Sequence, residues 1–390
     1  MKKIIICFLL LSLIPIRILK SDEKEEEIKI LKKQVQELLE KIEKLEKEQK
    51  KVSEKVEPKF KIKGRVATGY YNSEDDGNFP KGSFEIPEAK IQFLFQPDDI
   101  NTVIMRMDLN NAKFNTIDYL YLETKLDKLF NIDLPVYSRL GRFKIDFGEE
   151  TFSNNPVESV LPSNSASNVS GNDEGLLLKA NLSKNFSVSL SILNGNEGVG
   201  SDNNGPKALS TKFSYEFSNF YISGSFYNSF SLKDKNSEIK IAGLNSPPIG
   251  TSDWKRSFFE IDFRYDYKKG KILNPPSYSD SKGIIRSAYG IFKDDIKNGN
   301  DRDGWYGFVE GTLNLTDKLY FAARYSIVEL DDGIIAKLNG IDSNKYERLS
   351  IGFGYRITKQ TIFKFSYDFN REKPEDKDND LFSILVSTIF

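Results

Sequence analysis

The sequence predicts an all-β fold, an antiparallel transmembrane β-barrel of about sixteen strands, preceded by a short α-helical coiled coil. Three observations support this prediction. Apolar and polar residues alternate in one segment after another from residue 60 onward, as they do in strands with two different faces. These segments run about nine to thirteen residues, the length that a tilted strand needs to cross a bilayer, whereas strands of water-soluble proteins average about five or six. The connections between them are alternately short and long.

The first segment of the chain, residues 1–21, has the pattern of a secretory signal peptide. Lys2 and Lys3 precede an apolar run at residues 4–14. That run is too short to span a bilayer comfortably and fits the apolar region of an export signal. An uncleaved anchor is the alternative interpretation. We expect the protein to be exported to an outer membrane.

Residues 22–57 are predicted to form a coiled coil in the periplasm. Lys and Glu occupy most positions, no Gly or Pro interrupts the segment, and Pro58 ends it. Apolar residues follow a spacing of three and four, with Gln49 in the one missing place, which indicates a heptad seam. The seam consists of Ile28, Leu31, Val35, Leu38, Ile42, Leu45, Val52 and Val56. Such a narrow stripe favours self-association, as a dimer or a trimer, and a lone helical tether is the alternative.

Residues 58–390 form the predicted barrel. In the segment 254–267, Phe259, Ile261 and Phe263 alternate with Glu260 and Asp262. We expect the apolar face to contact lipid and the charged face to line a wet lumen. The sixteen candidate strands lie near 60–72, 84–96, 101–110, 116–126, 136–146, 173–182, 186–194, 208–216, 219–230, 254–267, 283–292, 304–315, 318–330, 346–357, 361–370 and 381–390.

The connections predict how the barrel lies in the membrane. The breaks after the sixth, eighth, twelfth and fourteenth segments are very short, whereas most breaks after odd-numbered segments are long and polar. Bacterial barrels have short periplasmic turns and longer external loops. Asn236, Asn298 and Asp376 are therefore expected outside the cell. The last segment ends on Phe390, which resembles the signal that the barrel-assembly machinery recognises in bacterial outer-membrane barrels.

Composition excludes several kinds of chemistry. The chain has no His and a single Cys, Cys7. Ser-His-Asp triads, His-metal sites, intrachain disulfides and thiolate clusters are therefore impossible. The net charge of -1 gives no reason to expect a nucleic-acid partner. No cofactor or metal motif is present, and the sequence predicts a protein that is not an enzyme.

The longest connection, residues 147–172, follows the fifth segment. It is predicted to be the third external loop and to fold inward, where it would narrow the pore. Its Ser- and Asn-rich part, 163–172, could instead form a disordered tip.

The stretch that enters this loop, RLGRFKIDFG at 139–148, resembles the phosphate-selective porin O and P family. Residues 173–182 and 348–369 look similar to that family as well. The resemblance implies a homotrimer, sixteen strands, a basic lumen and a lysine-bearing constriction loop, and it gives Arg142 and Lys144 the basic positions before the loop. Both residues alternate with Phe143 and Ile145, so they are expected to face the lumen. The loop departs from the pattern, because it carries three Glu and no Lys or Arg.

These observations predict a porin that gives passive, weakly selective diffusion of small hydrophilic solutes or ions across an outer membrane. A phosphate- or anion-selective porin is one alternative, and a structural barrel tethered to peptidoglycan by its coiled coil is another. The predicted pore and constriction residues are Arg142, Lys144, Glu149, Glu150, Glu158, Arg106 and Arg324.

Overall fold

The computed structural model describes residues 21–53, 58–196, 205–232, 236–244, 253–267, 276–331 and 333–390. The chain divides into two units, Met1–Glu57 and Pro58–Phe390. Apart from Ser21, the predicted signal peptide lies outside the described residues.

The first unit contains one long helix, α2 (Ser21–Ser53). It begins one residue before the segment 22–57 that was predicted to be helical, and the absence of Gly and Pro explains why it is continuous. Several apolar side chains of the predicted seam are exposed on it, among them Leu31, Val35 and Leu38. The association of these seams stays a prediction. No described helix is long and apolar enough to cross a bilayer.

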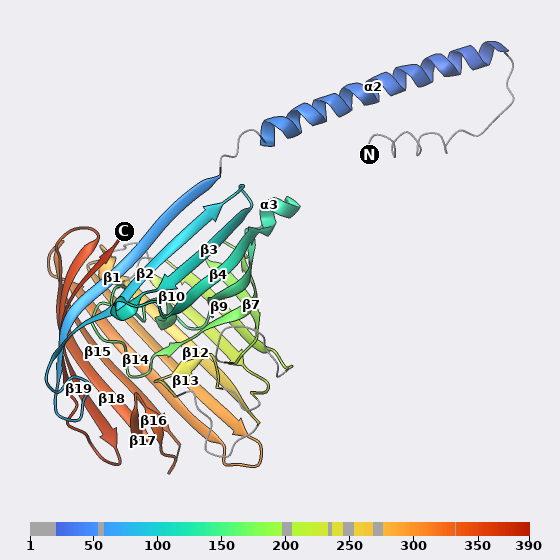
Figure 1. Ribbon diagram of the computed structural model, residues 1–390. Coiled ribbons are helices and arrows are strands. Elements are labelled where there is room, and N and C mark those ends of the chain that lie inside the picture. The colour runs from blue at the N-terminus through green and yellow to red at the C-terminus, as the bar shows by residue number, and fades with distance from the viewer. Residues whose placement is uncertain are drawn as a thin grey trace. The chain divides into compact units, whose positions relative to one another are not determined.

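The second unit is a closed antiparallel barrel of sixteen strands, as predicted (Figure 1). Each strand pairs with its neighbours in chain order, and β1 pairs with β20 to close the sheet. The barrel strands are β1 (Lys59–Ser73), β2 (Ser83–Gln96), β3 (Asn101–Asp108), β4 (Thr116–Lys125), β5 (Val136–Lys144), β7 (Asn172–Asn181), β8 (Phe186–Leu193), β9 (Ala208–Phe217), β10 (Phe220–Asn228), β12 (Trp254–Tyr267), β13 (Gly283–Ile296), β14 (Arg302–Asn314), β15 (Leu319–Leu330), β18 (Lys345–Arg356), β19 (Thr361–Lys373) and β20 (Leu381–Ile389).

The remaining elements are short and belong to the connections. Two small two-stranded sheets lie outside the barrel sheet. In one, β6 (Val169–Ser170) pairs with β11 (Lys240–Ile241), and in the other, β16 (Ala336–Leu338) pairs with β17 (Ile341–Ser343). The short helices are η1 (Asn110–Ala112), α3 (Leu126–Phe130), η2 (Glu150–Phe152) and η3 (Pro276–Tyr278).

The two faces of the wall follow the predicted alternation. On β12, Phe259, Ile261 and Phe263 are exposed on the outer surface, whereas Glu260 and Asp262 are buried inside. The same pattern holds on β18, where outward apolar residues alternate with inward small ones. Side chains of successive strand residues point to opposite faces, so a closed sheet separates the two sets completely.

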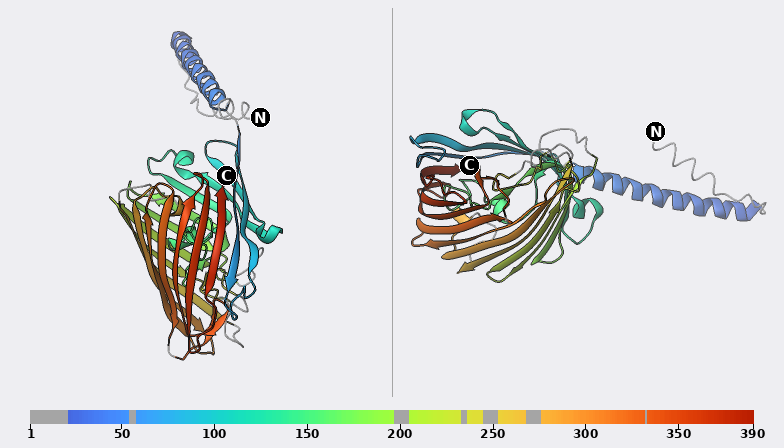
Figure 2. Two further views of the ribbon diagram at one scale, coloured as in Figure 1. Left: turned by 90° about the vertical axis from the view of Figure 1, so that its left-hand side faces the viewer. Right: turned by 90° about the horizontal axis from the view of Figure 1, so that it is seen from below.

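The two ends of the barrel differ in their connections (Figure 2). At the short-turn end, the connections 182–185, 218–219, 315–318 and 357–360 are tight. The opposite, long-loop end carries the connection 145–171 and the segments that contain β11, β16 and β17. Two connections at the short-turn end are longer: the one between β4 and β5, which contains α3, and the one between β12 and β13, residues 268–282, which contains η3.

Phe390 closes the seam between the first and last strands. The backbone N–H groups of Gly64 and Phe390 each donate to the other residue's carbonyl oxygen over 2.9 Å. The Phe390 ring packs directly on Gly64, so a Cβ at this position would force the ring to move.

Candidate pore site

The connection between β5 and β7, residues 145–171, crosses the interior of the barrel and is called the inner loop below. The Tyr320 hydroxyl on β15 donates to the Val160 carbonyl over 2.9 Å, and the Lys364 ammonium on β19 donates to the Val157 carbonyl over 2.8 Å. Both strands are far from β5 in the barrel order. Most of the loop's apolar side chains, including Leu161, are completely buried, and Phe152 is the exposed exception. The predicted inward folding of this loop is therefore confirmed.

The inner loop begins where β5 leaves the wall. Pairing of β5 with β4 ends at Arg142 and Leu120, whereas its pairing with β7 continues to Lys144. Beyond Arg142 one edge of β5 is thus free to bend into the lumen.

The strand register contradicts one prediction made from alternation. Phe143 and Ile145 were expected on the lipid face, opposite Arg142 and Lys144, but they are fully buried in an apolar cluster. Leu140, which is 62% exposed, marks the outer face of β5. Arg142 lies on the same face as Leu140, since it pairs with the exposed Leu120, and Phe143 lies on the inner face. The expected inward direction of Arg142 is therefore wrong, because the two faces of this stretch were assigned the wrong way round.

Arg142 and Lys144 both contact loop segments. Arg142 forms ion pairs of 3.2 Å with Glu174 on β7 and with Glu238 in the connection between β10 and β12. Lys144 donates to the Thr151 carbonyl and, over 3.0 Å, to Asn154 Oδ1. These contacts hold the loops in place.

Glu150 and Arg324 also hold the inner loop. Glu150 accepts hydrogen bonds from the Ser165 hydroxyl over 2.7 Å and from the Ser165 N–H over 3.3 Å, and burial raises the pKa of its carboxyl. Arg324 on β15 donates to the Ser163 carbonyl over 2.8 Å and lies 3.5 Å from Glu310. Both side chains are almost inaccessible, so they support the loop.

The inner loop borders two cavities that have no lining residue in common. The larger, about 890 Å³, is called the mixed cavity because cations and acids line it together. Glu149 enters it from the loop, 2.6 Å from Lys212 Nζ, and accepts a hydrogen bond from the Tyr221 hydroxyl over 2.5 Å. Arg264 and Arg286 also line it, and its other charged lining residues are Asp133, Lys179, Lys184 and Glu216.

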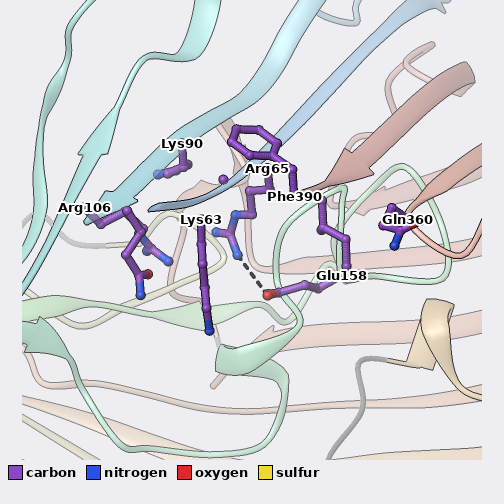
Figure 3. Close-up of a pocket in the computed structure, with 10 residues that line it drawn as sticks. Lys63, Arg65, Lys90, Arg106, Glu158, Gln360 and Phe390 are labelled. Carbon is purple, nitrogen blue, oxygen red and sulfur yellow. Dashed lines mark ion pairs between the residues drawn. The ribbon is translucent and has the colours of Figure 1, made fainter. Parts of the chain in front are cut away.

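The smaller cavity, about 390 Å³, is called the basic cavity (Figure 3). Four cations on β1, β2 and β3 line it together with two amides, and Glu158 of the inner loop is the one acid among its ten lining residues. Its lining consists of Lys63, Gly64, Arg65, Lys90, Gln92, Arg106, Glu158, Gln360, Ile389 and Phe390.

Ion pairs fix most of the cations of the basic cavity. Arg65 Nε lies 2.5 Å from Glu88. Lys90 lies 2.6 Å from Asp118, and Arg106 lies 3.1 Å from the same carboxylate. The Arg106 guanidinium also lies 3.6 Å from the centre of the Tyr119 ring, a cation–π contact.

The seven predicted pore residues thus fall into two groups, those that line a cavity and those that contact loop segments. Arg106 and Glu158 line the basic cavity and Glu149 lines the mixed cavity, whereas the other four contact loop segments as described above. Lys63, Arg65 and Lys90 were not predicted as pore residues. A signal for the first two exists, because basic residues occupy every second position of the stretch KFKIKGR at 59–65.

Comparisons with known proteins agree with this architecture. Residues 171–390 match the family model described as "Putative beta-barrel porin-2, OmpL-like". No curated protein matches the chain.

Solved structures of bacterial outer-membrane proteins share the fold. The anion-selective porin from Comamonas acidovorans has a TM-score of 0.58 at 10% identity, covering 86% of this chain and 100% of its own. The outer membrane channel DcaP of Acinetobacter baumannii has a TM-score of 0.57 at 13% identity, covering 86% of this chain and 98% of its own. The trimer form of OmpT from Vibrio cholerae has a TM-score of 0.54 at 12% identity, covering 86% of this chain and 100% of its own.

Proposed function

Because the chain belongs to the putative beta-barrel porin-2, OmpL-like family and is an outer-membrane porin, we propose that it passes small hydrophilic solutes and ions passively and with weak selectivity. The observation that carries this proposal is the inner loop, which crosses the lumen and leaves cavities lined by charges of both signs. Opposed charges set up a local field without creating a channel of one sign. The family and the fold are those of a channel rather than of an enzyme.

Reconstitution in planar bilayers tests the proposal. Folded protein should give stepwise increases in conductance, with reversal potentials that indicate only weak preference between cation and anion. Absence of conductance steps from protein whose barrel is demonstrably folded would refute passive transport.

The orientation and the assembly are part of the same proposal. We place the short-turn end and α2 in the periplasm and the long-loop end outside the cell, with Phe390 presented to the assembly machinery at the periplasmic side. The exposed seams of three α2 helices would associate and join three copies of the chain into a homotrimer. Outer-membrane lipid would surround the three barrels. The trimer form of Vibrio cholerae OmpT supports a trimer only by analogy of fold.

Two alternatives have specific support. The basic cavity favours an anion-selective channel, in line with the resemblance to phosphate-selective porins, although the inner loop contributes acids only. The helix α2 favours a tether to peptidoglycan, since its 33 residues extend about 50 Å at 1.5 Å per residue. Deleting 22–57 separates tethering from transport: a tether would lose envelope integrity while single-channel conductance survives.

A further inference from the structure

The basic cavity already contains a carboxylate, and that carboxylate belongs to the protein. Glu158 of the inner loop lies with one oxygen 3.0 Å from Arg65 Nη1 (dashed line in Figure 3). Its other oxygen accepts a hydrogen bond from Asn155 Nδ2 over 2.5 Å. Arginine is well suited to bind carboxylates. The cavity is therefore chemically able to hold a carboxylate at this point.

The side chain of Glu158 can leave Arg65 without any movement of the loop backbone. The Ser277 hydroxyl donates to the Glu158 carbonyl over 2.9 Å. The Lys364 ammonium donates to the neighbouring carbonyls of Val157 and Ser159 over 2.8 and 2.6 Å. These bonds fix the main chain, whereas the carboxylate is about a quarter exposed. A rotamer change, a fast motion for a partly exposed side chain, is enough to vacate the guanidinium.

The remaining charges favour an anion in the vacated place. The acids that pair with the wall cations, Glu88, Asp108 and Asp118, are not among the lining residues, so the positive ends of these pairs face the cavity. Within the described part of the barrel, Lys63 has no ion-pair partner. The volume of about 390 Å³ is that of roughly a dozen waters at about 30 Å³ each, and Ile389 adds an apolar border. A carboxylate with a short carbon chain fills this space better than a bare inorganic ion does.

We propose that the basic cavity is a binding site for small organic carboxylates, and that Glu158 is an internal competitor for Arg65. An entering carboxylate takes the place of the Glu158 carboxylate, which turns away while the loop stays fixed. Access of the solute rests on the proposed porin function, but the binding itself does not. A tethered competitor acts at an effective concentration in the millimolar range or above, so natural affinity is weak, as a diffusion channel requires.

Binding is measured on the full folded chain in detergent, by titration with isotope-labelled acetate observed by nuclear magnetic resonance. Glu158→Gln keeps the shape of the side chain and removes its charge. It should tighten acetate binding about tenfold, because the internal competitor is lost. The control Glu375→Gln makes the same change in an exposed side chain of the connection between β19 and β20 and should bind acetate like the unmodified chain.

A second variant and a second probe complete the test. Arg65→Gln in the Glu158→Gln background should abolish the gain in affinity. Unchanged acetate affinity in folded Glu158→Gln protein would overturn the proposal, and so would inorganic phosphate binding more tightly than acetate. Conductance is recorded separately on the same samples. Loss of conductance with normal acetate binding would refute the porin function alone, and normal conductance without acetate binding would refute this inference alone.

Discussion

The outer and inner faces of the barrel wall come from the same strands but are specified in different ways. On β12 the residues Phe259, Ile261 and Phe263 are exposed on the outer surface. In a membrane that surface faces lipid, where any apolar side chain would serve. The inward residues of the same strand have named partners, such as Asp262, which accepts a hydrogen bond from the Glu149 N–H over 3.1 Å. The comparison teaches that polarity specifies the outer face, whereas individual contacts specify the inner one.

The largest effect should come from charging the outer face. Phe263→Arg places a cation against the lipid near the middle of β12 and should cost about 2–4 kcal/mol of unfolding free energy. Arg264→Ala, one residue away on the inner face, should cost about 1 kcal/mol, because Arg264 lines the mixed cavity and its truncation opens that cavity toward the buried partner Asp266. Denaturant unfolding in lipid vesicles measures both changes. Equal losses would show that the two faces are not distinguished by lipid and water.

The next effect concerns the contacts that hold the inner loop. Lys364→Met removes an ammonium that donates to three loop carbonyls, those of Pro156, Val157 and Ser159. It should cost about 1–3 kcal/mol and increase the noise of the open channel, since the loop would move. Lys337→Met, at an exposed position, should change neither the unfolding midpoint nor the noise. A quiet channel in the Lys364 variant would mean that other contacts suffice.

A smaller effect on selectivity should separate cavity residues from loop-holding residues. Glu149→Gln combined with Glu158→Gln removes one negative charge from each cavity and should shift reversal potentials toward anions. Glu150→Gln should shift them little, because Glu150 lines neither cavity and bonds to Ser165. Reversal potentials in asymmetric salt measure the shift. If Glu150→Gln matches the double variant, the ions take a route other than the two cavities.

The smallest effect is that of salt. Charges in contact with water interact over about 10 Å at 0.1 M salt and about 3 Å at 1 M. The weak selectivity should therefore disappear over this range, while the unfolding midpoint should change little. Selectivity that persists at high salt would indicate a dry constriction with direct coordination of the ion.

The sequence predicted the barrel well because its signals are local. Strand length and alternation are visible within a dozen residues, and β12, Trp254–Tyr267, has the predicted bounds. The same reasoning failed at Arg142 and Phe143, since alternation alone does not show which face of a strand points inward where both faces carry large side chains. The face that points inward depends on how the strand pairs with its neighbours, and pairing is a property of the assembled sheet.

The pore residues were only partly predictable for a similar reason. Alternation indicates that Arg324 faces inward, but it does not show that Arg324 is covered by the loop. The acceptors of Arg324 and Lys364 on the inner loop are backbone carbonyls, which every sequence contains. Lys63 and Arg65 could have been found, because basic residues alternate along 59–65, and this pattern was interpreted only as a strand.

The way the wall holds the inner loop has a consequence for protein engineering. Lys364 and Tyr320 hold the loop by its backbone carbonyls, so this part of the loop's path does not depend on the loop side chains that face the cavities. Position 158, which lies within this held segment, can then be varied while the loop keeps its path. A small library at this position should yield pores of graded permeability that share one scaffold, one assembly route and nearly one thermal stability.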